Sequence, residues 1–389
     1  MTSPALDPEL LVAQAREATG LEDLGEPTWQ EGIERLVTAL EDEAALHEIG
    51  VQVAAGDILT YLVNRLRVTD WHRRHAEIGS ADVTPPIVIV GQGRTGTTIL
   101  HDLLAQDPAH RVPLTWEVDR PLPPPQTATY DSDPRIAEVQ AQLDVTEQFI
   151  PDFKAMHPIG ARLAQECVRI TGADFRSMIF PTQYHVPSYA RWLLEHADMA
   201  PAYRWHRRFL QVLQSQHRAE RWVLKSPGHV WCLGDLLAEY PHALLVQTHR
   251  DPLRIIASLA SLLALLRRLA SNATSIATGA AEFAPYLLEG LDRSVTARQT
   301  GIVPAARVVD VQFAAFMADP FATVHAIYER LGLELTRDAE ARMRAFLAAN
   351  PQDKHGRHRY SFADTGLDAG EWRARARRYQ QYFDVASEP

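Results

Sequence analysis

The chain contains 389 residues, of which 46% are hydrophobic, so it can bury either one large α/β core with a helical addition or two domains. Its formal net charge of −10 argues against a nucleic-acid partner, because binding to a phosphate backbone requires a basic face. Two cysteines, Cys167 and Cys232, provide neither a disulfide framework nor a cysteine-rich metal site.

The sequence contains no segment typical of export or membrane insertion. The beginning of the chain is acidic and lacks the apolar stretch of a signal peptide. The longest apolar run, residues 255–266, includes two serines and is too short to span a bilayer. We therefore expect a cytoplasmic protein without a transmembrane segment.

Residues 5–78 have apolar positions at helical spacing, for example Ile58, Leu59, Leu62 and Leu66. The spacing predicts a helical extension over residues 1–80 that packs on the core, covers the site as a lid or forms a homo-oligomer contact. The second domain, residues 81–389, then begins with a proline-containing segment at residues 82–86.

A strand, a glycine-punctuated loop and a helix are predicted between residues 87 and 104. The strand is the β-branched run IVIV at residues 87–90, the loop has the sequence GQGRTGTT at residues 91–98, and the helix stops before Asp107-Pro108. In such a unit the loop amides and the positive end of the helix face an anion, and glycines let the backbone approach it.

This loop differs from that of NTP-hydrolysing enzymes in one informative way. Thr97 stands where their lysine contacts the β and γ phosphates, so Arg94 is the only cation in the loop. The loop resembles the 5′-phosphosulfate loop of sulfotransferases that use 3′-phosphoadenosine 5′-phosphosulfate (PAPS). By itself it does not separate a sulfotransferase from a kinase.

Two residues are candidate general bases. Glu117 follows the loop helix and stands beside Trp116, so we expect it in a partly desolvated turn near the reactive end of the nucleotide. His157, between a methionine and a proline, is the second candidate, although a single histidine is more often a structural hydrogen-bonding residue.

Residues 149–194 are rich in aromatic side chains and methionine, interrupted by prolines. Much of this segment must be ordinary core, but short apolar pieces of this kind also line pockets. We therefore expect acceptor-pocket helices at about residues 135–220 and a mostly apolar acceptor.

Cations follow two further predicted strands. Residues 221–225 read as a strand ending in Lys225, one of only three lysines in the chain, and residues 243–248 as a strand followed by Arg250. Because the carboxyl ends of parallel strands converge on one crevice, Lys225 and Arg94 should face the same anion. Arg250 and Ser258, about two helical turns later, would form a second anion site.

With these residues, the chain resembles the family of PAPS-dependent sulfotransferases, most closely the bacterial branch with an N-terminal helical extension that is related to carbohydrate and tyrosylprotein sulfotransferases. The resemblance implies an α/β, P-loop-type three-layer fold with a central parallel sheet flanked by helices. It also implies PAPS as sulfonate donor, 3′-phosphoadenosine 5′-phosphate (PAP) as product and no required metal, and Glu117 lies near the position of the base in the tyrosylprotein relatives.

The same resemblance implies a role for each candidate residue. Catalysis would fall to Arg94 and Lys225 with Glu117 or, failing it, His157, acting on a hydroxyl of an apolar small molecule or lipid. The nucleotide would be bound by the 5′-phosphosulfate loop, the 3′-phosphate pair and a basic segment that closes over it: Gly93, Arg94, Thr95, Gly96, Thr97, Thr98, Arg250, Ser258, Arg357, His358, Arg359 and Tyr360.

Two alternatives remain open. The strand predicted at residues 307–311 contains Asp310, which could hold magnesium with Thr98 in a P-loop kinase. The missing loop lysine and the second anion site count against a kinase. A catalytically silent PAPS-binding protein is the other alternative, and the intact set of cations counts against it.

Overall fold

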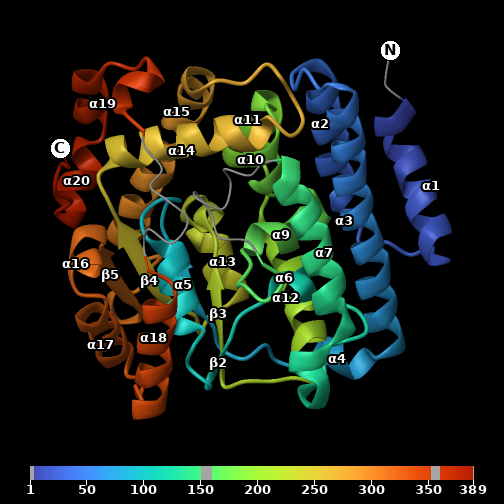
Figure 1. Cartoon of the computed structure of the whole chain (residues 1–389), viewed down its shortest axis with the longest axis horizontal. Helices are drawn as coiled ribbons and strands as arrows, with labels where there is room; N and C mark the ends of the chain where they lie inside the picture. Colours follow the sequence, from blue (N-terminus) through green and yellow to red (C-terminus); the bar gives the residue numbers. More distant parts are fainter. Residues whose placement is uncertain (1–3, 150–159, 352–359, 389) are drawn as a thin grey trace. The chain divides into compact units, whose positions relative to one another are not determined.

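The computed structural model describes residues 4–149, 160–351 and 360–388 (Figure 1). Contacts between residues divide the chain into two compact units. The first, which we call the helical unit, comprises Met1–Val83, Pro113–Arg218 and Leu263–Thr274. The second, the α/β unit, comprises Thr84–Val112, Ala219–Leu262 and Ser275–Pro389.

A five-stranded parallel sheet forms the centre of the α/β unit, with the strand order β2-β3-β1-β4-β5. The strands are β1 (Ile87–Val90), β2 (His110–Arg111), β3 (Arg221–Lys225), β4 (Leu244–His249) and β5 (Val308–Gln312).

The apolar run that predicted β1 fits its central position. All four of its residues are 0% exposed, as expected for a parallel strand that is covered on both faces. β5 lies at the edge of the sheet and exposes Asp310. Ile89 is in register with both Lys225 of β3 and Val246 of β4. The segments that follow these three parallel strands therefore leave the sheet at the same, carboxyl-terminal end of the strands.

Helices flank this sheet in two groups. The loop helix α5 (Thr97–Leu104) packs against β1 and β3 and contacts α18 (Arg337–Ala349). The long helix α15 (Ile276–Gln299) contacts α13 (Leu233–Glu239) and α20 (Arg377–Phe383). The predicted parallel sheet flanked by helices is therefore confirmed. The other α-helices described in the α/β unit are α16 (Phe313–Ala318), α17 (Pro320–Leu331) and α19 (Ala369–Arg375), and α14 (Pro252–Arg267) begins in this unit.

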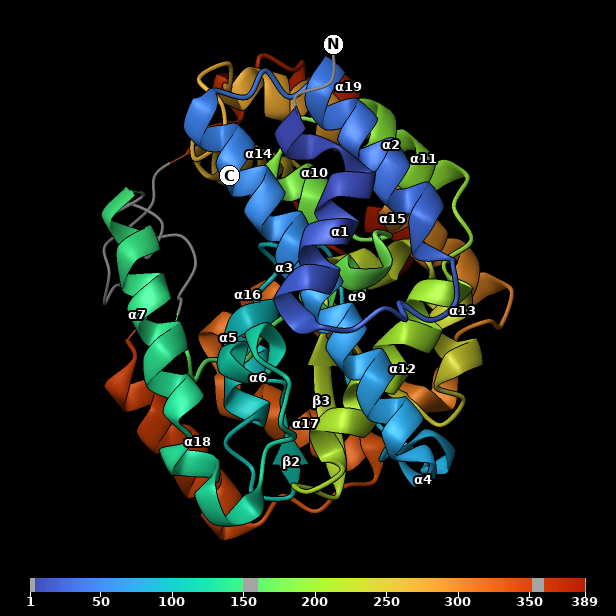
Figure 2. The same ribbon diagram turned by 90° about the vertical axis from the view of Figure 1, so that its right-hand side faces the viewer.

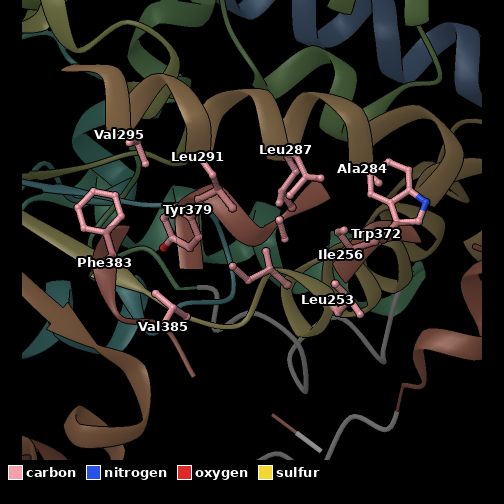
Figure 3. Close-up of a cluster of buried hydrophobic side chains, with 13 residues drawn as sticks. Leu253, Ile256, Ala284, Leu287, Leu291, Val295, Trp372, Tyr379, Phe383 and Val385 are labelled. Carbon is pink, nitrogen blue, oxygen red and sulfur yellow. The ribbon is translucent and has the colours of Figure 1, made fainter. Parts of the chain in front are cut away.

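An apolar cluster joins the first turns of α14 to α15, α19 and α20 (Figure 3). Its buried side chains include Ile256, Leu287, Trp372, Tyr379 and Phe383. The cluster continues past the end of α20 to Val385, which is 7% exposed.

The helical unit contains the helices predicted over residues 5–78, which are confirmed: α1 (Pro8–Thr19), α2 (Trp29–Asp42), α3 (Glu48–Arg74) and α4 (Ala76–Ser80). Helix α3 packs along α1 and also contacts α12 (Figure 2). The other α-helices described in this unit are α6 (Thr115–Asp119), α7 (Pro134–Phe149), α9 (Cys167–Thr171), α10 (Ile179–Gln183), α11 (Pro187–Glu195) and α12 (Ala200–Gln214).

Helices from residues 113–218 thus cluster with the N-terminal helices. The division into an extension of residues 1–80 and a domain of residues 81–389 stays a prediction. Within the described residues, no helix combines the length and the apolar character needed to cross a membrane.

A buried ion pair holds the helical unit together. Arg65 of α3 and Asp174 are 3% and 0% exposed, and their Nη1 and Oδ1 atoms are 3.1 Å apart. The same guanidinium donates to the carbonyl oxygens of Leu24 and Glu26, each at 2.8 Å. Arg176 is a second partner of Asp174, at 3.0 Å. One arginine of α3 therefore satisfies backbone acceptors that no helix or sheet provides for.

We predict that Arg65→Met lowers the free energy of unfolding by about 3 kcal/mol, the lower end of the range for breaking one side of a buried pair, because Arg176 still compensates Asp174. Chemical denaturation measures this loss. Arg73→Met is the matched control, because Arg73 is on the same helix but its side chain is 68% exposed, and it should change stability far less than Arg65→Met does. Equal losses in the two variants would contradict the prediction.

Candidate active site

The loop between β1 and α5 turns sharply at three residues with positive φ. Gly91 has φ 141° and Gly96, the N-cap of α5, has φ 87°, whereas Arg94 adopts φ 72° despite its side chain. A Cβ atom at Gly91 would lie 2.3 Å from Oγ1 of Thr248 at the end of β4. Only glycine permits both this conformation and this approach.

Hydrogen bonds tie the loop to the neighbouring strand. The hydroxyl of Thr95 donates to the carbonyl oxygen of Gln92 at 2.7 Å and lies 2.6 Å from Oγ1 of Thr248. The side-chain amide of Gln92 donates to the carbonyl oxygen of Leu287 in α15 at 3.1 Å. The loop is therefore fixed by buried contacts to β4 and α15.

Three residues that the sequence assigned to two anion sites lie together. Nε of Arg94 donates to Oγ of Ser258 at 3.0 Å, and Nη1 of Arg250 donates to the carbonyl oxygen of Arg94 at 2.9 Å. Burial lowers the pKa of Arg94, and although Tyr360 opposes this effect, the charge of Arg250 adds to it. Two cations held this closely favour an anion between or beside them.

Arg250 is further fixed by two contacts that the sequence did not predict. Its guanidinium lies over the ring of Phe313, 3.9 Å from the centroid. It also forms a two-point ion pair with Glu388, with Nε–Oε1 and Nη2–Oε2 distances of 2.8 and 3.0 Å. Burial by itself would lower the pKa of Arg250, but Glu388 and Tyr360 outweigh burial and the pKa is raised.

Lys225 ends β3, as predicted, and is 1% exposed. Its Nζ atom lies 3.3 Å from Oγ1 of Thr98 in the first turn of α5. The ammonium group therefore contacts the same strand-loop-helix unit that contains Arg94, and it adds a third cation to the α/β unit's candidate anion site.

Asp310, which the kinase alternative assigns to magnesium, is already held by a guanidinium group and an imidazole ring. Nη2 of Arg298 donates to it at 2.7 Å, and Nε2 of His249 lies 2.9 Å from its Oδ1. Burial alone would raise the pKa of Asp310, but these two partners lower it to about 2. In the described ranges, no group of three or more histidine, cysteine, aspartate or glutamate side chains is arranged to hold a metal ion.

Glu117 belongs to the helical unit and is 0% exposed. Its Oε2 atom accepts hydrogen bonds from the backbone N–H of Leu114 at 2.9 Å and from the hydroxyl of Tyr130 at 3.1 Å. The prediction that it lies in a turn was wrong, because Glu117 is inside the short helix α6 and its carboxylate satisfies the N-terminal amide of that helix. Glu117 thus has a structural role as a helix cap, and its role as a general base stays a prediction.

Other predicted residues are placed elsewhere or not at all. The candidates His157, Arg357, His358 and Arg359 lie outside the described residues. Tyr360 is described, and its ring lies 5.2 Å from the guanidinium carbon of Arg254. In the aromatic segment of residues 149–194, the described rings build the core of the helical unit: Phe175, Phe180, Tyr184, Tyr189 and Trp192 are all buried.

Comparison with known proteins identifies the family to which the chain belongs. The profile of the sulfotransferase family matches residues 85–338, which include β1, the loop, Lys225, Arg250 and Ser258. The chain belongs to the sulfotransferase family. It is thus a sulfotransferase with a central parallel sheet, as the sequence predicted.

Three similar proteins come from mycobacteria. The crystal structure of sulfotransferase STF9 from Mycobacterium avium is 30% identical, with a TM-score of 0.90, and the match covers 100% of this chain and 98% of that one. Sulfotransferase STF1 from Mycobacterium tuberculosis is 32% identical, with a TM-score of 0.84 and coverage of 95% and 98%. An omega-hydroxy-beta-dihydromenaquinone-9 sulfotransferase, Stf3 from Mycobacterium bovis, is 25% identical over 77% of this sulfotransferase and 76% of its own length.

We predict that Gly91→Ala lowers the free energy of unfolding by at least about 1–3 kcal/mol, because it adds backbone strain, and the new methyl group would also overlap Thr248. Thermal unfolding measures the change. Gly234→Ala in α13 is the matched control: its Cβ would meet nothing within 4 Å, so the variant should be neutral or up to about 1 kcal/mol more stable. Similar behaviour of both variants would contradict a close approach at Gly91.

Proposed function

We propose that this sulfotransferase moves the sulfonate group of PAPS to a hydroxyl of a mostly apolar small molecule or lipid. The observation that carries the proposal is the contact of Arg94 with both Ser258 and Arg250. A nucleotide with a phosphate at the 3′ position and a phosphosulfate at the 5′ position needs two anion sites a short distance apart. Residues that the sequence assigned to these two sites are linked by direct hydrogen bonds.

The 5′-phosphosulfate would be bound by the loop and the first turn of α5. Backbone amides at a helix N-terminus favour anions, and the αL conformations at Arg94 and Gly96 shape the loop for that purpose. Lys225 would neutralise charge that develops on the leaving phosphate oxygen. The loop residues in this role are Gly93, Arg94, Thr95, Gly96, Thr97 and Thr98. No metal is required in this proposal, because arginine and lysine supply the positive charge.

Arg250 and Ser258 would bind the 3′-phosphate. A guanidinium group donates two parallel hydrogen bonds to a phosphate, and the present two-point pair of Arg250 with a carboxylate has the same geometry. Tyr360, together with Arg357, His358 and Arg359, stays a predicted contact of the nucleotide.

In the proposed chemical step, Glu117 removes the proton of the acceptor hydroxyl while the acceptor oxygen attacks sulfur in line. The bond between sulfur and the bridging phosphate oxygen breaks, and Arg94 and Lys225 stabilise the PAP that leaves. His157 is kept as the alternative base. The carboxylate of Glu117 is buried, so bulk water is excluded from it.

The acceptor class rests on composition and on one relative. Stf3 is named for a hydroxylated menaquinone, a long apolar molecule with a terminal hydroxyl. We extend the class, a hydroxylated apolar compound, to this protein and leave the compound itself to experiment. Incubation with labelled PAPS and a panel of hydroxylated lipids, sterols, quinones and natural products tests the activity. A PAPS-binding protein without activity would label none of them.

We also propose that the protein works in the cytoplasm. The chain has only two cysteines, Cys167 and Cys232, which is too few for a disulfide framework and agrees with a reducing compartment. A role of residues 1–80 in forming a homo-oligomer remains part of the proposal.

We predict that PAP, at about 100 times its dissociation constant, stabilises the protein by about 2.7 kcal/mol in thermal unfolding. ATP with magnesium should have a far smaller effect, because Asp310 is held by Arg298 and His249 and the loop lacks the lysine of NTP-hydrolysing enzymes. A larger shift with ATP and magnesium than with PAP would favour the kinase alternative and overturn the nucleotide assignment.

We predict that Glu117→Gln lowers kcat by about 10² to 10⁴-fold, the usual contribution of a general base, while the Kd for PAP changes little. Glutamine keeps an oxygen that can accept from Leu114, so α6 should remain capped. Steady-state kinetics and PAP titration measure the two effects separately.

Two comparisons sharpen this test. Glu138→Gln, an exposed glutamate of α7 in the same unit, should leave kcat unchanged. His157→Asn should lower kcat by about tenfold if the imidazole only orients the acceptor. Full activity of Glu117→Gln beside an inactive His157→Asn would reverse the assignment of the base. If both are inactive, non-additive losses in the double variant would indicate a relay.

A further inference from the structure

The partner of Arg250 is a carboxylate of the chain itself. Nε and Nη2 of Arg250 donate to the two oxygens of Glu388 at 2.8 and 3.0 Å. The arginine side chain is 11% exposed and that of Glu388 is 27% exposed, so the pair is partly removed from water. A carboxylate therefore occupies the hydrogen-bonding edge of the residue to which the 3′-phosphate is assigned above.

The position of Glu388 is fixed by the segment that contains it. Val385 packs into the apolar cluster beside Tyr379 and Phe383 (Figure 3). The side-chain amide of Gln380 donates to the carbonyl oxygen of Val385 at 3.1 Å. The backbone N–H of Glu388 donates at 2.7 Å to Oδ2 of Asp251, the residue that follows Arg250 in the sequence. Anchors on both sides of residues 386 and 387 thus deliver the carboxylate to Arg250.

A second arginine lies next to the pair. Nε of Arg254, one helical turn after Arg250, is buried and has no hydrogen-bond partner among the described residues. It lies 3.7 Å from Oε2 of Glu388, which is close enough for charge attraction but too far for a hydrogen bond. A small shift of the carboxylate away from Arg250 would satisfy this buried donor.

We infer that the carboxylate of Glu388 competes with the nucleotide's 3′-phosphate for Arg250. When the phosphate binds, the carboxylate moves from Arg250 to Arg254. The inference rests on the proposed function, since it takes Arg250 as the 3′-phosphate site. A phosphate carries more charge than a carboxylate and has three acceptor oxygens, so it displaces Glu388 from a guanidinium. A nucleotide without a 3′-phosphate leaves the Arg250–Glu388 pair intact.

The exchange has a consequence for turnover. Breaking the Arg250–Glu388 pair reduces the net binding free energy of PAPS and of PAP alike, because both carry the 3′-phosphate. The pair also re-forms as PAP departs, which favours release of the product. Product release limits the rate of many enzymes. Glu388 is thus a residue that sets nucleotide affinity rather than one that performs chemistry.

Calorimetric titration of the full chain with PAP and with AMP tests the exchange. Glu388→Gln should tighten PAP binding by about tenfold, since the competing charge is gone, and should leave AMP binding unchanged. Glu371→Gln is the matched control, because this glutamate of α19 is 63% exposed and pairs only loosely with Arg375 at 3.7 Å. It should change neither affinity.

Arg254 supplies an independent test of the route. Arg254→Ala should weaken PAP binding several-fold where Glu388 is present, because the displaced carboxylate loses its new partner. In the Glu388→Gln background the same substitution should have little effect. A loss of equal size in both backgrounds would mean that Arg254 contacts the nucleotide directly, and it would overturn the transfer step. Hydrogen exchange of residues 386–388 should also rise when PAP binds to the wild type.

The outcomes separate this inference from the proposed function. If PAP binds, and binding is lost in Arg250→Ala but unchanged in Glu388→Gln, the competitor role is wrong and the 3′-phosphate site stands. Weaker PAP binding by Glu388→Gln would likewise overturn the competitor role. If the wild type and Glu388→Gln both fail to bind PAP, the proposed function falls and this inference falls with it.

Discussion

Close approach of β1 and β4 at Gly91 is the constraint on which the candidate nucleotide site depends. Parallel pairing sets Val90 opposite Gln247, so the next residues, Gly91 and Thr248, meet at a distance that excludes a side chain on the first. Thr95 then closes the loop onto the same threonine hydroxyl. This closure puts the carbonyl oxygen of Arg94 within reach of Arg250, which leaves the end of β4. The register of β1 and β4 thus requires glycine at position 91, and the loop that this glycine permits determines the contact between Arg94 and Arg250.

Much of this could be predicted from the sequence, because the signals are local. Four β-branched residues before a glycine predict a buried strand and a turn, and a cation at the end of a strand lies where parallel strands converge. Helical spacing from Arg250 predicts Ser258 as its neighbour in the site. In the structure, Arg94 contacts both of these residues. Each of these features depends on a few consecutive residues or on one regular period.

The remaining features depend on residues that are far apart in the chain. Glu388 pairs with a residue that precedes it by more than a hundred positions, and no period or motif marks it. The sequence predicts Glu117 in a turn, whereas the structure has it inside α6. Its carboxylate accepts from the backbone N–H of Leu114 and from the hydroxyl of Tyr130, and neither contact is marked by a sequence motif. The buried set around Arg65 is also invisible in sequence, because it joins α3 to Asp174 and to loop carbonyls. Such long-range contacts between polar groups leave no periodic pattern or motif in the sequence from which they could be predicted.

The cations explain why Glu388 belongs in the fold. Burial of Arg250 and of Arg94 beside it concentrates positive charge in a protein whose net charge is −10. Uncompensated buried charge destabilises a fold by several kcal/mol, so the arrangement needs an anion of its own. Glu388 supplies one, and its two-point pairing stabilises Arg250 in the orientation that a phosphate requires. In the proposed exchange, an incoming phosphate must also replace the stabilisation that the carboxylate of Glu388 gives to Arg250, so the proposed affinity for the nucleotide depends on the strength of this pair.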